Sequence, residues 1–276
     1  MLKINNDFMK GILSCPVIFV KNVVGEIYLM RLHCPPMAKI IAPGQFINIK
    51  VNNELIPLLR KPFSVCRRDA DEGWIEILWK IVGKGTEIMS RYEVGEKVNV
   101  LGPLGHGFHI PSNMQVALLV GGGLGVAPLP FLCEEVLRLG KTALVFLGAK
   151  SVNELSLKGL FQEMGVETFI ATEDGSEGKC GLVTDIIIEY LKQADHLNQK
   201  HFFSCGPTGL LNYMIKITEE YNIEGQISIE TMMACGFGIC MGCPLRVRGE
   251  HAGVELYKFA CLDGPVFDAR EVWLDG

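Results

Sequence analysis

The most constraining feature of this sequence is a glycine-rich loop with three cysteines. Cys235, Cys240 and Cys243 follow the spacing C-x4-C-x2-C, and Cys261 follows further along the chain. This spacing is typical of the plant-type [2Fe–2S] ligand pattern, in which backbone N–H groups face the cluster sulfurs. Glycines at 236, 238 and 242 would let the backbone turn sharply and approach the cluster. We therefore expect these four cysteines to be iron ligands.

Two other interpretations of the cysteines are a zinc site and buried free thiols. A structural zinc site usually has two C-x2-C pairs, whereas Cys240 and Cys243 form the one such pair here and Cys261 has no near neighbour. Buried free thiols are the second alternative, because cysteine packs as a small hydrophobic residue. The chain has ten cysteines in all. We interpret Cys15, Cys34, Cys66, Cys133 and Cys180, which stand singly, as structural thiols.

Length and composition limit the remaining possibilities. A chain of 276 residues exceeds one ordinary hydrophobic core, so two domains and a small appendage are expected. The net charge of −5, with no basic run, gives no electrostatic footprint for nucleic acid. Apolar runs such as 116–120 are far shorter than a membrane span, and residues 1–6 lack the apolar core of a signal peptide. We expect a cytoplasmic protein.

The first hundred residues predict an antiparallel barrel or sandwich. Short apolar and β-branched runs alternate with Gly, Pro and Asn, which favours short strands over alternating strands and helices. One short helix is expected at 86–92. The expected strands are 17–24, 27–32, 45–51, 63–67, 74–81 and 97–101.

Two segments of this region carry chemistry. The first segment places two cations, an aromatic ring and a hydroxyl at the start of an expected strand: Arg60, Lys61, Pro62, Phe63 and Ser64. The second segment, with Gly83, Gly85 and Thr86, precedes the expected helix, where free N–H groups favour a phosphate. Taken alone, the first is more often a solvated edge and the second a turn with a helix cap.

The middle of the chain predicts an α/β domain. Strands at 116–120, 143–147, 167–171 and 201–205 alternate with helices, which indicates a doubly wound parallel sheet. Gly121, Gly123 and Gly125 follow the first strand, although they do not match G-x-G-x-x-G, which would need glycine at 126. The last of these strands leads into Cys205, Gly206 and Pro207 at the ligand-binding edge. The alternative for this triplet is a strand end before a proline-initiated helix.

Taken together, these segments resemble the ferredoxin–NADP reductase superfamily. The resemblance implies that Ser64 bonds flavin N5, that Phe63 lies beside the flavin ring and that the loop of Gly83, Gly85 and Thr86 holds the pyrophosphate. The arginine of that family aligns with Lys61, which lacks a bidentate fork, so either Arg60 or Lys61 would contact the pyrophosphate. The glycines at 121, 123 and 125 would hold a nicotinamide nucleotide, with Cys205, Gly206 and Pro207 near its ring.

Across its whole length the chain resembles the electron-transfer subunits of B-type, NAD-linked dihydroorotate dehydrogenases. That resemblance implies a barrel binding FAD at 1–112, a Rossmann-like domain binding NAD(H) at 113–226 and a [2Fe–2S] module at 227–276. It also implies an FMN-containing catalytic partner in a hetero-oligomer, because no orotate site is visible in this chain. Ferredoxin:NADP oxidoreductase and sulfhydrogenase partners are alternatives, as is a redox sensor without turnover.

Overall fold

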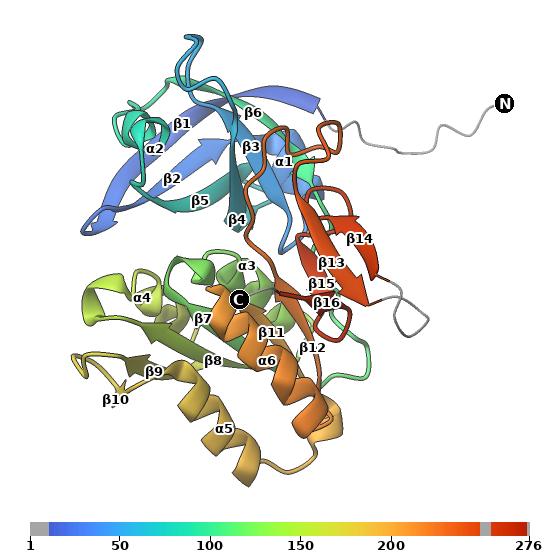
Figure 1. Ribbon diagram of the computed structural model, residues 1–276. Coiled ribbons are helices and arrows are strands. Elements are labelled where there is room, and N and C mark those ends of the chain that lie inside the picture. The colour runs from blue at the N-terminus through green and yellow to red at the C-terminus, as the bar shows by residue number, and fades with distance from the viewer. Residues whose placement is uncertain (1–10, 249–254, 275–276) are drawn as a thin grey trace, which may run out of the picture.

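A computed structural model describes residues 11–248 and 255–274. The expectation about a signal peptide falls on residues 1–6, outside this range. Figure 1 shows a barrel packed on one edge of a helix-covered sheet, with a small C-terminal sheet beside both. The combination of antiparallel barrel and Rossmann-like sheet confirms the predicted fold class.

The N-terminal part is a closed antiparallel barrel in the strand order β1-β2-β5-β4-β3-β6. Its interior is filled by apolar side chains, of which Met30, Ile47 and Trp79 are almost fully buried. Its strands are β1 (Gly11–Val24), β2 (Ile27–His33), β3 (Phe46–Lys50), β4 (Lys61–Asp69), β5 (Trp74–Lys80) and β6 (Lys97–Leu104), and its helices are α1 (Pro35–Ile40) and α2 (Lys84–Met89).

Helix α1 was not predicted. It begins with two prolines, which suit a first helical turn because the N–H groups there have no intrahelical acceptor. Met37 and Ala38 on this helix are buried in the barrel core. Its single turn therefore closes one end of the barrel and is stabilised by packing more than by helix propensity.

The second unit is a seven-stranded sheet in the order β10-β9-β8-β7-β11-β12-β15. All neighbouring pairs are parallel except the last, in which β15 is antiparallel to β12. The strands are β7 (Val116–Gly122), β8 (Thr142–Ala149), β9 (Glu167–Thr172), β10 (Lys179–Cys180), β11 (Lys200–Cys205), β12 (Glu224–Ser228) and β15 (Val266–Asp268).

Alternating side chains on the central strands supply two separate cores. Leu119 and Phe203 belong to the core under α3 and α4, whereas the neighbouring Leu118 and Phe202 belong to the core under α5 and α6. Helices thus cover both faces, as a doubly wound sheet requires. The helices are α3 (Leu129–Arg138), α4 (Lys158–Glu163), α5 (Val183–Gln193) and α6 (Thr208–Glu220), with single 3-10 turns η1 (Gly123–Val126), η2 (Val152–Glu154) and η3 (Leu197–Gln199).

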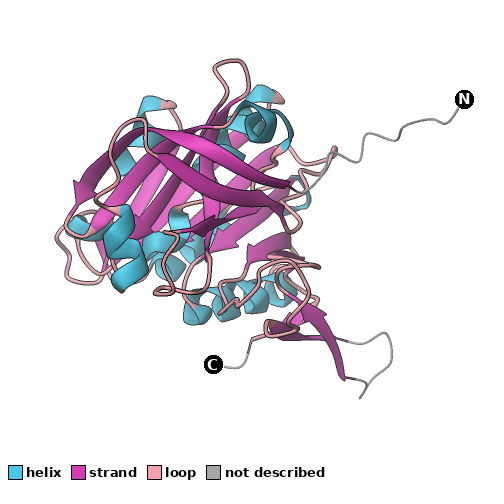
Figure 2. Ribbon diagram, turned by 90° about the horizontal axis from the view of Figure 1, so that it is seen from above, coloured by secondary structure: helices cyan, strands magenta, loops and turns pink. Residues whose placement is uncertain are grey.

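The C-terminal segment contributes to two sheets. After β12 the chain crosses to the barrel, as Figure 1 shows, and then forms β13 (Pro244–Arg248), β14 (Glu255–Phe259) and β16 (Val272–Trp273). These three form a sheet in the order β14-β13-β16. In Figure 2 the β13–β14 pair stands apart from the main body. Strand β15, between β14 and β16, instead pairs with β12 at the edge of the large sheet.

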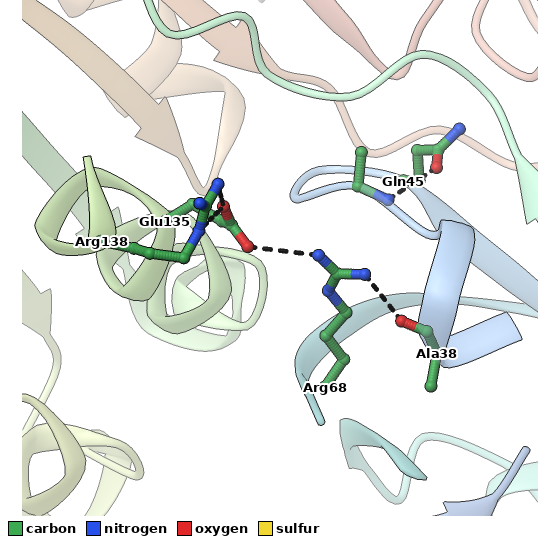
Figure 3. Close-up of polar contacts among 6 residues, drawn as sticks. Ala38, Gln45, Arg68, Glu135 and Arg138 are labelled. Atoms are coloured by element: carbon green, nitrogen blue, oxygen red, sulfur yellow. Dashed lines mark hydrogen bonds and ion pairs between the residues drawn. The ribbon is translucent and has the colours of Figure 1, made fainter. Parts of the chain in front are cut away.

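Two arginines of β4 fix the barrel against α3. Arg67 Nε lies 2.7 Å from the Glu134 carboxylate, and Arg68 Nη2 lies 3.3 Å from the Glu135 carboxylate. Figure 3 shows Arg68 between Glu135 and the carbonyl oxygen of Ala38 on α1, to which it donates at 2.7 Å. These half-buried pairs set the orientation of the two large units.

No helix within residues 11–248 and 255–274 combines the length and apolar character needed to cross a membrane.

Candidate functional site

A cavity of about 340 Å³, here called cavity A, lies where the barrel, the large sheet and the C-terminal segment meet. Ser64 and Thr86 reach it from the barrel, and Gly125 and Cys205 reach it from the large sheet. The structure therefore brings residues of both predicted nucleotide segments to one site. Glu230, which follows β12, also lines this cavity.

Strands β3 and β4 form the barrel wall of cavity A. Their antiparallel register places Ser64 opposite Phe46 and Phe63 opposite Ile47. Pro62, Phe63, Ser64 and Phe46 all line the cavity, and the Phe63 ring also lies 6.4 Å from that of Trp79. The Ser64 hydroxyl makes no hydrogen bond within the described part of the chain and lines cavity A, so it is available to a bound molecule.

The predicted phosphate loop is shaped by Thr86. The Thr86 hydroxyl oxygen accepts hydrogen bonds from the N–H groups of Val82 at 2.9 Å and Gly83 at 3.2 Å, and it donates to the Gly83 carbonyl at 2.9 Å. Such bonds from a side chain to a helix start replace missing intrahelical partners. The hydroxyl thus holds the loop, and α2 begins one residue after Gly83.

The structure separates the two candidate cations. Arg60 donates to the backbone carbonyls of Asn48 and Asn99, at 3.1 and 3.3 Å, and to the Asn99 side-chain oxygen at 2.6 Å. These bonds fix its guanidinium on the barrel wall. Lys61 instead packs against Gly85, where an added Cβ would lie 3.1 Å from Lys61 Cε. Of these two cations, Lys61 is therefore the one beside the loop that contains Gly83, Gly85 and Thr86.

The glycine segment after β7 lies directly against the segment after β11. A Cβ added to Gly125 would lie 2.4 Å from Gly206 Cα, so this approach requires glycine. Gly123 also has a φ of +54°, in the left-handed region that glycine tolerates. Gly121, near the end of β7, packs against Leu129 of α3. These contacts bring the two predicted nicotinamide segments together.

A second cavity, cavity B, has a volume of about 510 Å³ and lies at the carboxyl ends of β7, β8, β9 and β11. Gly122, Gly123 and Pro207 line it, and Leu124 and Cys205, close to them in the chain, line cavity A. Among the described residues that line it, Lys150 is the one cation, and the acidic residues are Glu154, Glu173 and Asp185. Parallel α/β sheets bind nucleotides in this position.

Cys205 and Glu230 form a polar corner of cavity A. Burial raises the pKa of the Cys205 thiol, and the nearby Glu230 carboxylate raises it further, so the thiol stays protonated. The protein packed around Glu230 raises the pKa of its carboxyl group, although the side chain remains accessible through the open cavity. Sequence reasoning missed Glu230, because its relevance depends on β12 ending beside β11.

The four predicted metal ligands are arranged as two pairs. Cys243 Sγ lies 3.3 Å from Cys261 Sγ, while Cys235 Sγ accepts a hydrogen bond of 3.4 Å from the Cys240 N–H. The β13–β14 ladder sets the first pair, since Cys243 O accepts the N–H of Ala260. A [2Fe–2S] cluster needs two ligands on each of two irons, which matches paired thiols.

Backbone N–H groups face the sulfurs of this loop. Burial raises the pKa of Cys235, but the N–H groups of Cys240, Phe237 and Ile239 outweigh it and lower the pKa to about 6. Gly242 N–H likewise donates to Cys240 Sγ at 3.4 Å. Iron is bound by thiolates, and N–H donors stabilise sulfur that carries negative charge. The residues present therefore fit an iron–sulfur cluster.

Strand β3 joins the cysteines to cavity A, which sequence reasoning also missed. Phe46 lines cavity A and packs in one apolar cluster with Cys243 and Cys261. Met233 also borders both groups. Two residues beyond Phe46, the Asn48 side chain donates to the Cys235 carbonyl. No local pattern marks these positions, because their partners are far away in the sequence.

Of the five cysteines interpreted as structural thiols, four are buried and one is exposed. Cys15, Cys34, Cys66 and Cys133 are buried, as structural thiols should be, and the sulfurs of Cys15 and Cys34 lie 2.6 Å apart. The interpretation of Cys180 as a structural thiol was wrong, because this residue is exposed on β10. A two-residue edge strand has too little chain around it to bury a side chain.

Family models match two regions of the chain. The model described as "Oxidoreductase FAD-binding domain" matches residues 14–109, which form the barrel. The model described as "Iron-sulfur cluster binding domain of dihydroorotate dehydrogenase B" matches residues 230–273, which contain all four paired cysteines. These matches confirm FAD and an iron–sulfur cluster as the expected cofactors.

Similar proteins cover almost the whole chain. The electron transfer subunit of dihydroorotate dehydrogenase B (NAD(+)) from Desulforamulus reducens is 33% identical over 264 residues, covering 96% of this chain and 99% of that protein. The corresponding subunit from Bacillus mycoides is 37% identical over 260 residues, covering 94% and 97%. A solved NADH-dependent reduced ferredoxin–NADP oxidoreductase superposes with a TM-score of 0.82 at 28% identity, covering 96% of this chain and 91% of that one.

These relatives are similar enough, over enough of the chain, to assign it to a family. The structure agrees, since it has paired cysteines, a cavity shared by barrel and sheet, and a second cavity at the carboxyl ends of the sheet strands. The chain belongs to the family of electron transfer subunits of NAD(+)-dependent dihydroorotate dehydrogenase B.

Proposed function

We propose that this chain passes electrons between NAD(H) and an FMN-containing dihydroorotate dehydrogenase subunit during the oxidation of dihydroorotate to orotate. The observation that carries the proposal is cavity A, which joins Ser64 of the barrel to Cys205 of the nucleotide sheet. The same cavity shares Phe46 and Met233 with the packing around the cysteine pairs. One site thus borders both the source and the exit of electrons.

The barrel residues of cavity A would hold FAD. Nicotinamide transfers two electrons as a hydride, whereas an iron–sulfur centre transfers one electron at a time. FAD can do both and would therefore connect the two. Ser64 would offer its unengaged hydroxyl to the flavin edge, with Phe63 and Pro62 beside the ring. Lys61 would place its ammonium group at the pyrophosphate with the loop of Gly83, Gly85 and Thr86, and Arg60 would stabilise the barrel wall behind it.

Cavity B would hold the dinucleotide on Gly121, Gly123 and Gly125, with its nicotinamide end reaching cavity A beside Cys205, Gly206 and Pro207. The protonated Cys205 thiol would orient that end without adding charge. Three carboxylates and one lysine line cavity B, so a ribose 2′-phosphate would be repelled. This composition supports NADH as the substrate rather than NADPH.

Cys235, Cys240, Cys243 and Cys261 would hold the [2Fe–2S] cluster as two pairs. The proposed functional units are 1–112 for FAD, 113–226 for the nucleotide and 227–276 for the cluster, with β15 as an edge strand shared with the nucleotide sheet. Thiolate ligands and free thiols both persist in a reducing compartment, which supports the cytoplasm as the location.

The partner would dock over the cysteine loop. Phe237, Ile239 and Met241 are exposed there, although large apolar side chains are normally buried. Grouped apolar residues of this kind are common at the centre of interfaces. The alternative role for these three side chains is to shield the cluster from water. Two electron transfer subunits flanking a dimeric catalytic subunit would give the hetero-oligomer.

The decisive experiment is reconstitution with an FMN-containing dihydroorotate dehydrogenase. We expect the two chains to co-purify and to reduce NAD⁺ when dihydroorotate is added, with this chain alone giving no dihydroorotate-dependent reduction. Co-purification with a dehydrogenase of another substrate would replace the dihydroorotate assignment with one of the other partner types. If anaerobic NADH left the flavin spectrum unchanged, a sensor without turnover would be favoured.

A further inference from the structure

The Asn48 side chain connects the barrel to the cysteine loop. It lies on β3, is only 1% exposed, and its Nδ2 donates to the carbonyl oxygen of Cys235 at 2.8 Å. The loop packs tightly on this amide, because a Cβ added to Gly236 would lie 2.4 Å from Asn48 Nδ2. A buried polar group of the barrel thus holds the backbone of one predicted cluster ligand.

The oxygen of the Asn48 amide shows that its N–H donor, and not its oxygen, is the group used at this position. Asn48 Oδ1 is buried and has no hydrogen-bond partner among the described residues. An unpartnered buried acceptor costs free energy, which an apolar side chain of similar size would avoid. Turning the amide over would place Oδ1 against the Cys235 carbonyl, where two acceptors cannot bond. The amide is therefore useful at this position for its donor alone.

Strand β3 also touches the proposed flavin site. Phe46 lies opposite Ser64 in the β3–β4 register and lines cavity A, and Asn48 lies opposite Pro62. The Asn48 carbonyl is itself fixed by Arg60 at 3.1 Å. The segment that holds the cysteine loop is thus anchored to the strand that would contact the flavin.

We infer that Asn48 is a positioning residue for the iron–sulfur cluster. By holding the Cys235 carbonyl, it keeps the following turn in the conformation that directs the Cys240 N–H at Cys235 Sγ, 3.4 Å away. Hydrogen bonds to cluster sulfurs and nearby charge set the reduction potential of such clusters. Asn48 therefore sets the cluster potential from the barrel side. This inference rests on the proposed function.

Two variants separate this role from a general packing role. Asn48→Asp has the same shape but replaces the donor by a charged acceptor, and Asn48→Leu removes both polar groups, including the unpartnered oxygen. We expect a lowered cluster midpoint potential in both, and more so in Asn48→Asp because of the added negative charge. Asn22→Ala is the control, since it removes amide-to-carbonyl bonds to Gly25 at 2.7 Å and Ile27 at 3.4 Å at the β1–β2 turn, away from the cysteine loop.

The measurements use the purified holoprotein: iron and sulfide content, FAD content, the EPR spectrum of the reduced cluster and a redox titration. A lowered potential with an altered EPR spectrum and full FAD content supports the inference, as does loss of the cluster alone. A wild-type potential and spectrum in both variants would overturn it, and so would joint loss of FAD and cluster from Asn48→Leu, which indicates a packing role. A wild-type protein without iron would instead overturn the proposed function itself.

Discussion

At the scale of single residues, the Ser64 hydroxyl has the most direct expected effect on chemistry. Ser64→Ala removes an oriented hydrogen bond from the proposed hydride-accepting edge of FAD, and such a loss costs roughly 1–3 kcal/mol, or about ten- to a hundredfold in rate. We expect slower flavin reduction by NADH in stopped-flow absorbance, with FAD still bound. Ser90→Ala is the control, because Ser90 Oγ bonds the Glu87 carbonyl at the exposed end of α2. An unchanged rate would place Ser64 away from the reacting edge.

His201 predicts a dependence of stability on pH. Burial lowers the pKa of His201 to about 4, so the folded protein keeps this ring neutral while the unfolded chain binds a proton near pH 6.5. The neutral buried ring therefore contributes fully to the free energy of unfolding above about pH 6.5. As the pH falls towards about 4, the unfolded chain gains the proton first and the free energy of unfolding decreases by roughly 3 kcal/mol. His201→Gln should flatten the acid side of the curve of unfolding free energy, measured by urea titration. A slope identical to that of the wild-type protein would contradict this assignment.

Candidate site residues could be predicted from the sequence where the spacing of nearby residues indicates their chemistry. The cysteine pattern and the segment ending in Ser64 are of this kind. In the structure Cys243 lies beside Cys261, and Ser64 lines cavity A. Asn48, Phe46 and Glu230 were not identified, because each gains its role from a partner on another element. Asn48 and Cys235, for example, are 187 positions apart.

At the scale of elements, the predicted strands of the barrel and large sheet are present, with boundaries shifted by a few residues. Helix α1 was missed because Cys-Pro-Pro indicates a loop, whereas burial of Met37 and Ala38 stabilises a single helical turn. Between β8 and β9, where the alternation of strands and helices predicts one helix, the chain forms the 3-10 turn η2 and the six-residue helix α4. Local propensity cannot decide such cases, since tertiary packing outweighs it.

The cysteine loop should depend on its metal. Cys240→Ala removes one thiolate from the Cys235–Cys240 pair, so we expect loss of the broad cluster absorbance and of iron. The β13–β14 sheet should become more susceptible to proteolysis, while FAD stays bound because the barrel has its own core. Iron analysis and limited proteolysis test this result. Cys180→Ala, at an exposed cysteine outside the loop, should behave like the wild-type protein; full iron in Cys240→Ala would refute the ligand set.

At the scale of the whole molecule, neighbouring residues connect the three proposed sites. Gly123 of cavity B precedes Leu124 of cavity A in the chain, and Phe46 of cavity A packs with Cys243 and Cys261. The Arg67–Glu134 and Arg68–Glu135 pairs hold the barrel and sheet in the orientation that makes cavity A continuous with both units. This arrangement leaves the cysteine loop at the surface. We therefore expect electrons to leave the chain at this loop.

That surface gives a prediction about assembly. Ile239 and Val94 are both 76% exposed, but only Ile239 belongs to the proposed docking face. Ile239→Asp would place a charge at the centre of an apolar interface, and we expect at least a tenfold weaker association with the catalytic partner. Val94→Asp should not change the affinity. Titration calorimetry or analytical ultracentrifugation tests the pair, and equal affinities for the two variants would assign Ile239 to shielding the cluster.

The position of β15 has a consequence for how the protein is made. Strand β12 is paired on its outer side by Val266–Asp268, which follows all four cysteines of the loop in the sequence. During synthesis the nucleotide sheet therefore emerges from the ribosome with an open edge, and this edge is closed only after the cysteine loop has also emerged. Open strand edges recruit other chains. Newly made protein that has not folded its last segment would thus be vulnerable to aggregation, and timely delivery of iron and sulfide would shorten that period.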